Sequence, residues 1–200
     1  MSTTEATTQD GTEAGTGTSV TALPIAAGTY ALDANHSGIH FQIRHLGLSN
    51  VRGTFKAFDA TLVVGDSLET VAVTATVELS SVDTNQPDRD AHLLGTDFFS
   101  AEANPQMTFV STAVRALDAE EYELDGTLTI NGITKPVTLE VEFNGSEIFP
   151  ADGTRHVGFT ATAEIKRNDY AIDFNMPLGT GKLALGEKVK VELDLQFVAP

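Results

Sequence analysis

Five histidines are the residues of this sequence that could most readily bind a metal or transfer a proton. Their spacings match no metal-binding motif, and His40 and His45 would face opposite sides of a strand. His45 ends the apolar strand face of Ile39, Phe41 and Ile43, which favours a partly buried histidine held by a structural hydrogen bond. The alternative is that His45 lies at the mouth of a cavity and contacts the polar head of a ligand. We predict no metal site from the five, which are His36, His40, His45, His92 and His156.

Two charged pairs, Arg89 with Asp90 and Arg167 with Asp169, have two possible roles. In the first, these residues cap turns and pair with each other. In the second, a guanidinium near a cavity mouth holds a diphosphate or a carboxylate through two parallel hydrogen bonds. We select Arg167 as the candidate for binding a head group, and in that role it should be dispensable for folding.

Motifs for covalent catalysis or nucleotide binding are missing from the sequence. There is no Gly-x-Ser-x-Gly elbow, no phosphate-binding glycine loop and no dinucleotide fingerprint. The absence of cysteine excludes thiol catalysis, disulfides and thiolate metal sites. We therefore predict no catalytic residue, no cofactor and no enzymatic activity. The alternative is an enzyme acting on a hydrophobic substrate, in which His45 and a neighbouring carboxylate form an acid–base pair.

The charge balance limits the partners of this chain. It has 12 basic and 28 acidic residues, a formal net charge of -16. Such a chain repels phosphate backbones and anionic membranes, so we predict no nucleic-acid partner. No stretch reaches the ~20 apolar residues of a membrane helix, so we predict no stable membrane insertion. Because Met1 to Thr18 lacks a basic residue and an apolar run, it does not resemble a signal peptide, and we expect a cytoplasmic location.

The chain divides into a tail and one domain. Residues from Met1 to about Thr21 are rich in Thr, Ser, Gly and Glu and include no aromatic residue. Such a composition cannot bury enough apolar surface to become ordered. We therefore predict a disordered tail over residues 1–24 and a folded domain over residues 25–200.

Alternation of apolar and polar residues dominates the predicted domain and indicates strands. Asn131-Gly132 between two such runs favours a tight hairpin turn, because both positions need positive φ. Pro87 to Leu94 is compatible with a short helix, with Pro in its first turn and Gly95 after its end. The alternating faces include Ile39, Phe41, Ile43 and His45; Val71 to Leu79; Met107, Phe109, Ser111 and Ala113; Val137 to Phe143; Val157 to Ile165; and Val189 to Phe197.

These elements predict an all-β fold, an antiparallel β-barrel of about eight strands with one or two short helices, although a sandwich would also bury the same faces. Several runs have about 10–12 residues, against a usual mean of ~5–6. Long tilted strands make a tall and narrow barrel, and an apolar lumen of that shape suits a hydrocarbon chain. A lumen filled by side chains is the alternative.

The order of six short motifs resembles the YceI-like family over about Gly28 to Val198. The resemblance implies a lipocalin-like barrel that binds a polyisoprenoid or similar lipid without catalysis. Tyr30 stands where the family often has Trp, and the secretory signal of many members is absent. The motifs are Tyr30 to Asp33 with His36 and Phe41; Val51 to Phe55; Arg89 to Leu93 with Asp97 to Phe99; Asn104-Pro105; Gly126 to Val137; and Arg167 to Tyr170 with Gly186 to Val189.

The resemblance and the alternating strands together define a candidate ligand-binding site. We expect a long-chain isoprenoid or other lipid along the lumen, with His45 and Arg167 at its head group. The second alternative to this function is an acidic interaction scaffold whose loops or tail bind a protein, and a homodimer is also possible. The residues expected along the hydrocarbon are Phe41, Ile43, Phe55 and Phe109.

Overall fold

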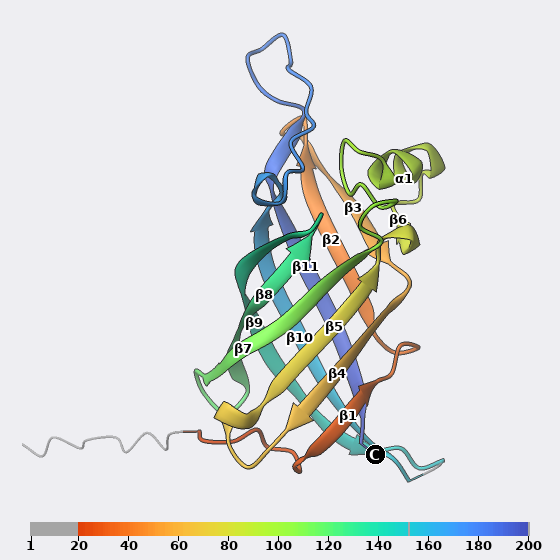
Figure 1. Cartoon of the computed structure of the whole chain (residues 1–200). Helices are drawn as coiled ribbons and strands as arrows, with labels where there is room; N and C mark the ends of the chain where they lie inside the picture. The colour runs from red at the N-terminus through yellow and green to blue at the C-terminus, as the bar shows by residue number, and fades with distance from the viewer. Residues whose placement is uncertain (1–19, 152, 200) are drawn as a thin grey trace, which may run out of the picture.

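The computed structural model describes residues 20–151 and 153–199, and most of them lie in antiparallel strands (Figure 1). Residues 1–19 of the predicted tail lie outside the described residues. The strands are β1 (Gly28–Leu32), β2 (Gly38–His45), β3 (Ser49–Phe55), β4 (Phe58–Val64), β5 (Ala72–Glu78), β6 (Val82–Asp83), β7 (Gln106–Ala116), β8 (Glu121–Ile130), β9 (Ile133–Ile148), β10 (Arg155–Lys166) and β11 (Leu185–Val198). Helix α1 spans Pro87–Leu94, and 3-10 turns are η1 (Leu68–Thr70), η2 (Leu79–Ser81) and η3 (Arg167–Tyr170).

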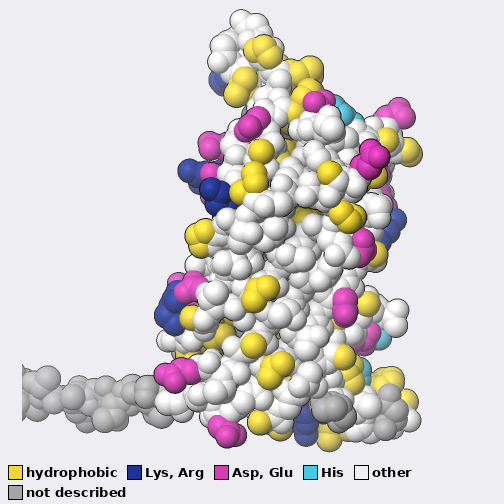
Figure 2. All heavy atoms as spheres, viewed as in Figure 1, with side chains coloured by type: hydrophobic (Ala, Val, Ile, Leu, Met, Phe, Trp, Pro, Cys, Tyr) yellow, Lys and Arg dark blue, Asp and Glu magenta, His cyan; other side chains and the backbone are white. Residues whose placement is uncertain are grey.

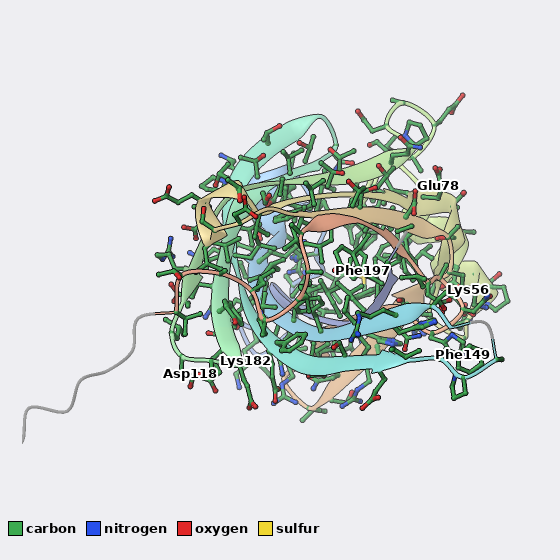
Figure 3. All side chains as sticks on the ribbon, turned by 90° about the horizontal axis from the view of Figure 1, so that it is seen from below. Lys56, Glu78, Asp118, Phe149, Lys182 and Phe197 are labelled. Carbon is green, nitrogen blue, oxygen red and sulfur yellow. The ribbon has the colours of Figure 1, made fainter. Side chains whose placement is uncertain are left out.

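In this described part, eight strands close into a ring in the order β1-β4-β5-β7-β8-β9-β10-β11. The ring closes where β1 pairs with the end of β11 through Ala31–Val198 and Leu32–Phe197. Strand β2 pairs with the first part of β11, and β3 and β6 extend the wall from there. Seen along the axis, the strands surround a core of side chains (Figure 3). The prediction of an antiparallel barrel of about eight strands is confirmed.

Alternation along each strand places the apolar residues inside the ring. Cross-strand neighbours such as Phe159–Leu195 and Val191–Phe41 share the inner face. The predicted inner face of β7 is wrong at its C-terminal end, where Ala113 was expected to face inward. The register of β7 against β8 shifts between Ser111 and Ala113, so Val114 lines the interior and Ala113 is exposed. A bulge adds one residue to a strand and reverses the side-chain alternation beyond it.

The predicted turn and helix are both present. Asn131 and Gly132 have φ of 53° and 71°, as the tight turn between β8 and β9 requires. Helix α1 begins at Pro87, where the Oε1 atom of Gln86 accepts a 2.7 Å hydrogen bond from the backbone N–H of Arg89. Leu93 and Leu94 of α1 pack on the apolar cluster around Phe55, on the upper wall of the barrel. No helix in the described residues is long and apolar enough to cross a bilayer.

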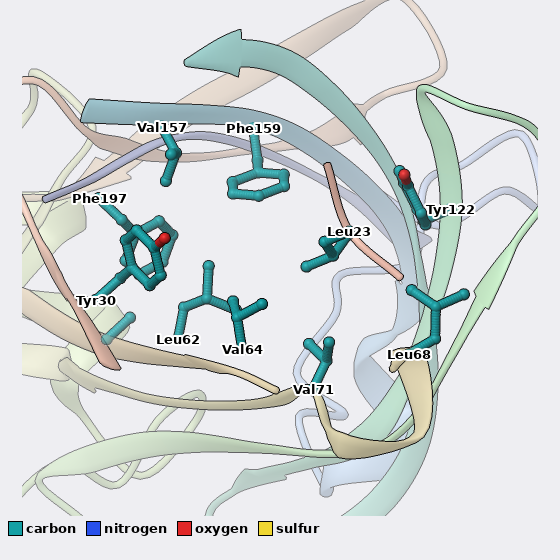
Figure 4. Close-up of a cluster of buried hydrophobic side chains, with 11 residues drawn as sticks. Leu23, Tyr30, Leu62, Val64, Leu68, Val71, Tyr122, Val157, Phe159 and Phe197 are labelled. Atoms are coloured by element: carbon teal, nitrogen blue, oxygen red, sulfur yellow. The ribbon is translucent and has the colours of Figure 1, made fainter. Parts of the chain in front are cut away.

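One end of the barrel is closed by the chain that precedes β1. Leu23 is buried between strands, and the carbonyl of Thr21 accepts a 2.9 Å hydrogen bond from Leu68 at η1. Figure 4 shows Leu23 and its apolar neighbours converging at this end. The tail was expected to extend to residue 24, and within it Thr21 and Leu23 contact the barrel. The cluster contains Leu23, Tyr30, Ala60, Leu62, Val64, Leu68, Val71, Tyr122, Val157, Phe159 and Phe197.

Candidate functional site

A cavity of about 490 Å³ occupies the barrel interior. Side chains of β2, β3, β4, β5, β7, β8, β9, β10 and β11 form most of its wall, and most of them are apolar. The cavity lies between the alternating strands from which an apolar lumen was expected. All six candidate ligand-binding residues line it: Phe41, Ile43, His45, Phe55, Phe109 and Arg167.

Two glycines allow aromatic rings to lie close against the wall. Gly53 pairs directly with Phe41, and a Cβ atom added at Gly53 would lie 2.4 Å from the Phe41 ring. At Gly126 an added Cβ atom would lie 2.3 Å from the ring of Phe109. Such distances are far below van der Waals contact, so each ring occupies the space that a side chain would take. The two rings thus lie against the backbone instead of extending farther into the lumen.

The upper wall is built from contacting aromatic rings. The ring centroids of Phe41 and Phe55 lie 5.5 Å apart, and those of Phe55 and Phe99 lie 6.0 Å apart. Phe55 is buried, and Phe41 and Phe99 are half-buried. These separations are typical of stabilising aromatic pairs. The rings link β2 and β3 to the chain that follows α1.

The end of the barrel opposite Leu23 is open. Met176 lines the cavity but remains 57% exposed, and His45 at the end of β2 is half-buried. His92 of α1 lies edge-on to the rings of Phe98 and Phe174, each with a centroid separation of 5.0 Å. All five residues line the cavity, so its mouth lies between α1, the end of β2 and residues 174–176.

Arg167 is buried at this end, with only 4% of its surface exposed. Its Nε atom donates a 2.9 Å hydrogen bond to the carbonyl of Gly186, and Nη1 donates to the carbonyls of Ile172 and Phe174. Burial lowers the pKa of its guanidinium, while the nearby charges of Asp173 and Glu187 act in the opposite direction. These hydrogen bonds join η3 to the start of β11, so they favour a structural role for Arg167 beside the head-group role, and its dispensability for folding stays a prediction.

Arg89 is a second arginine at the mouth, and it is exposed. Its Nε atom donates to Oγ1 of Thr84 and its Nη2 atom to the Thr84 carbonyl, each at 2.7 Å. Asp90 accepts from the backbone N–H and the hydroxyl of Thr84. Among residues 20–151 and 153–199, neither Arg89 nor Arg167 forms an ion pair with a carboxylate. The expected pairing of these arginines with their neighbouring aspartates is thus not formed.

The enzyme alternative requires a carboxylate beside His45, and the structure shows none within ion-pair distance among the described residues. The histidines that contact a carboxylate in the described chain are His36, His92 and His156, whereas His45 has no such partner. The imidazole of His45 also has no hydrogen-bond partner within the described residues, although a structural hydrogen bond was expected. Within the described residues, no three His, Asp or Glu side chains are grouped as a metal site would need.

Sequence reasoning missed three contributors to this cavity. Gly53 and Gly126 were recognised as motif residues without a role, although a glycine inside a strand often marks a close approach. Arg89 was identified as a possible anion ligand but was not selected. Arg167 was selected, but its carbonyl partners come from the η3 and β11 regions, and no local pattern reveals that convergence.

Comparison with known proteins agrees with this architecture. A UPF0312 protein from Staphylococcus epidermidis is 43% identical over 170 residues, covering 84% of this chain and 96% of that protein. The crystal structure of a Campylobacter jejuni YceI protein has a TM-score of 0.66 at 29% identity, covering 78% of this chain and 90% of its own.

A more distant structure shares the fold. A polyisoprenoid binding domain from Saccharophagus degradans has a TM-score of 0.62 at 16% identity, covering 86% of this chain and 98% of that domain. The sequence-family model for the YceI-like domain matches residues 30–197, which extend from the first barrel strand to the last. This chain therefore belongs to the YceI-like family.

Proposed function

We propose that this protein binds a long-chain amphiphile, a polyisoprenoid or similar lipid with an acidic head, and carries or sequesters it without catalysis. One observation carries the proposal: an apolar cavity of about 490 Å³ has two arginines without ion pairs at its open end. This volume is within the range of ~300–1,000 Å³ that is usual for small-molecule sites. The polyisoprenoid binding domain of Saccharophagus degradans, which has the same fold, supports the ligand class.

The apolar wall supplies the affinity for the hydrocarbon part. Each methylene that leaves water for this wall contributes roughly 0.8 kcal/mol, so about ten of them offset the cost of association. The aromatic rings of Phe41, Phe55 and Phe109 give a wall with few polar atoms along the lumen. A compact polar ligand would lose its hydration there without finding hydrogen bonds.

The head group belongs at the open end, where charge can be matched. In the described part of a chain of net charge -16, neither Arg89 nor Arg167 has a carboxylate within ion-pair distance, although Asp173 and Glu187 lie near enough to Arg167 to raise its pKa. Nη2 of Arg167 and Nη1 of Arg89 donate no hydrogen bond within the described residues. Both nitrogens are available to phosphate or carboxylate oxygens, which form strong hydrogen bonds with guanidinium groups. His45 lies at the same end as a further polar contact.

Native mass spectrometry and organic extraction of the purified protein test the proposal. We expect a co-purifying lipid in the parent protein. Ile43→Glu introduces a carboxylate into the lumen and should abolish retention, whereas Gln42→Glu adds the same side chain on the opposite face of β2. Circular dichroism must show both variants folded. A parent protein without extractable lipid that also fails to take up an added long-chain isoprenyl phosphate would refute the proposal.

A head-group variant separates charge recognition from hydrocarbon binding. Arg89→Gln removes a cation that lines the mouth and is exposed, so folding should be retained. We expect weaker retention of an isoprenyl phosphate and unchanged retention of the corresponding neutral alcohol. Equal retention of both ligands by variant and parent would exclude Arg89 from the head-group site.

A cytoplasmic location and a homodimer stay predictions. Light scattering tests the homodimer.

A further inference from the structure

Two loops meet at the open end of the barrel and extend beyond it. The β2–β3 turn contacts the segment before β11 through a 2.7 Å hydrogen bond from the N–H of Leu46 to the carbonyl of Ala184. Residues 175–185 form a small hairpin, in which Pro177 and Leu183 are bridged and the side chain of Asn175 bonds to Leu185. Figure 1 shows this hairpin as the blue loop above the barrel.

Both loops present large apolar side chains to solvent. Leu48 is 82% exposed, and Met176 and Leu183 are each 57% exposed. Leu46, 37% exposed, has a φ of 54°, a conformation that glycine or asparagine would adopt at lower cost. Figure 2 shows hydrophobic side chains gathered over the upper loop. We call Leu46, Leu48, Met176 and Leu183 the apolar tip.

The two segments that carry the apolar tip contain no acidic residue, although the neighbouring α1 region contributes Asp88, Asp90 and Asp97. Residues 44–52 and 174–186 contain Arg44, Arg52 and Lys182 but none of the 28 acidic residues. Arg44 and Lys182 form no ion pair within the part of the chain that the structure describes. An exposed apolar patch bordered by cations is complementary to a membrane surface that contains anionic lipid.

We propose that the apolar tip docks on an anionic phospholipid bilayer, with its leucines in the interfacial region and Arg44 and Lys182 at the lipid phosphates. The tip borders the mouth of the cavity, since Met176 belongs to both. A docked barrel therefore opens toward the bilayer. The transfer of a lipid through this mouth rests on the proposed function, but the docking itself is measured without it.

The net charge of -16 does not prevent such docking. At physiological ionic strength, charges separated by more than about 8 Å are largely screened. The acidic residues at the base of the hairpin are Asp173 and Glu187, each four residues from the bridged pair of Pro177 and Leu183. Four extended residues span about 13 Å, so these carboxylates are farther from a docked surface than Lys182, whereas Arg44 packs beside Gly186 at the base of the hairpin.

Flotation with vesicles tests the docking of the full chain. We expect binding to equimolar phosphatidylcholine and phosphatidylglycerol, with weaker binding to phosphatidylcholine alone. Leu48→Asp and Leu183→Asp should each lower binding at least about tenfold, and Lys182→Gln about fivefold. The matched control is Leu117→Asp, because Leu117 is 60% exposed in the β7–β8 turn at the other end, beside Asp118.

A fluorescence measurement gives an independent readout, because the chain contains no tryptophan. A tryptophan introduced by Leu48→Trp should shift its emission to the blue when mixed vesicles are added. One introduced by Leu117→Trp should not shift. Leu48, Leu183 and Lys182 do not line the cavity, so these variants should keep any lipid that the parent retains. Organic extraction of the same samples thus separates failure of docking from failure of lipid binding.

Three results would overturn the proposal. The first is no flotation and no blue shift with either vesicle. The second is an equal loss of binding in Leu117→Asp, which would show that docking is not specific to the tip. The third is a dimer that Leu48→Asp dissociates in light scattering while vesicle binding is absent, which would assign the tip to a second copy of this chain.

Discussion

At the scale of single residues, two glycines help to set the width of the cavity. Phe41 and Phe109 fill the space beside Gly53 and Gly126 that a side chain would otherwise take. Any larger residue must push the ring into the lumen or displace the strand. These positions therefore affect ligand capacity although neither contributes a side chain to the wall.

Gly53→Ala tests this relation between wall and lumen. The new methyl group would lie 2.4 Å from the Phe41 ring and 2.8 Å from Thr84, so the ring must move inward. We expect the free energy of unfolding to fall by about 1–3 kcal/mol, as for an overpacked core, and lipid retention to fall with it. Urea denaturation and organic extraction measure the two effects. Gly179→Ala, where an added Cβ meets nothing within 4 Å, should change neither, and equal behaviour of the two variants would contradict the relation.

Residues that line the lumen were predictable because alternation along a strand determines which side chains face inward. Phe41, Ile43 and His45 follow directly from that rule. The role of Arg167 does not, because its charge is stabilised by carbonyl groups up to 19 residues away in the sequence. An arginine after a strand is compatible with an exposed or a buried position, and tertiary hydrogen bonds decide between them.

At the scale of elements, the shortest pairing in the ring is reinforced by a polar cluster. Strand β1 pairs with β11 at two positions only, and the chain then bends into β2. Asp33 lies in this bend and accepts hydrogen bonds from His36 at 2.7 Å and from the Gln196 side chain at 3.3 Å. Gln196 also bonds to His156 at 2.8 Å, so the cluster joins β1 to both β10 and β11.

This cluster predicts a specific pH dependence. The hydrogen bond from His36 is the main cause that lowers the pKa of Asp33 below its ordinary value of 3.8. Because the folded pKa is the lower one, this carboxylate stabilises the fold above pH 3.8, and the contribution is lost as the pH falls through the folded pKa. Asp33→Asn should therefore be less stable than the parent near neutral pH, with the difference shrinking below about pH 4.

Urea denaturation across this pH range measures the difference in unfolding free energy. Asp66→Asn, at an exposed position in the loop after β4, is the control and should follow the parent at every pH. A difference between Asp33→Asn and the parent that does not change with pH would show that the cluster acts by packing alone.

Elements were predicted well where a local signal was strong, as at Asn131-Gly132 and at Pro87 to Leu94. The bulge in β7 was not, because nothing in its residue types distinguishes an added residue from continued alternation. Ser111 accepts a 2.8 Å hydrogen bond from the N–H of Val73 at this point, a contact between strands that are 38 residues apart. Such a contact becomes visible only once the barrel is closed.

At the scale of the whole molecule, the two ends of the barrel differ in packing. Leu23 closes one end as part of the largest buried cluster, whereas Met176 borders the opposite end and stays exposed. A ligand chain inside the barrel can therefore leave through the mouth without disturbing the core. The two ends also differ in their residues, because the arginines, the apolar tip and the cavity mouth all lie at the same end.

A pair of alanine substitutions at the two ends tests this difference. Both residues line the same cavity, yet Leu23 is 9% exposed and Met176 is 57% exposed. Leu23→Ala should lower the free energy of unfolding by about 2–5 kcal/mol, because it leaves a void in a packed cluster. Met176→Ala should change it by less than about 0.5 kcal/mol, because few of its contacts are buried. Urea denaturation decides: equal losses would mean that the mouth is packed like the core and that a ligand cannot enter there without unfolding part of the barrel.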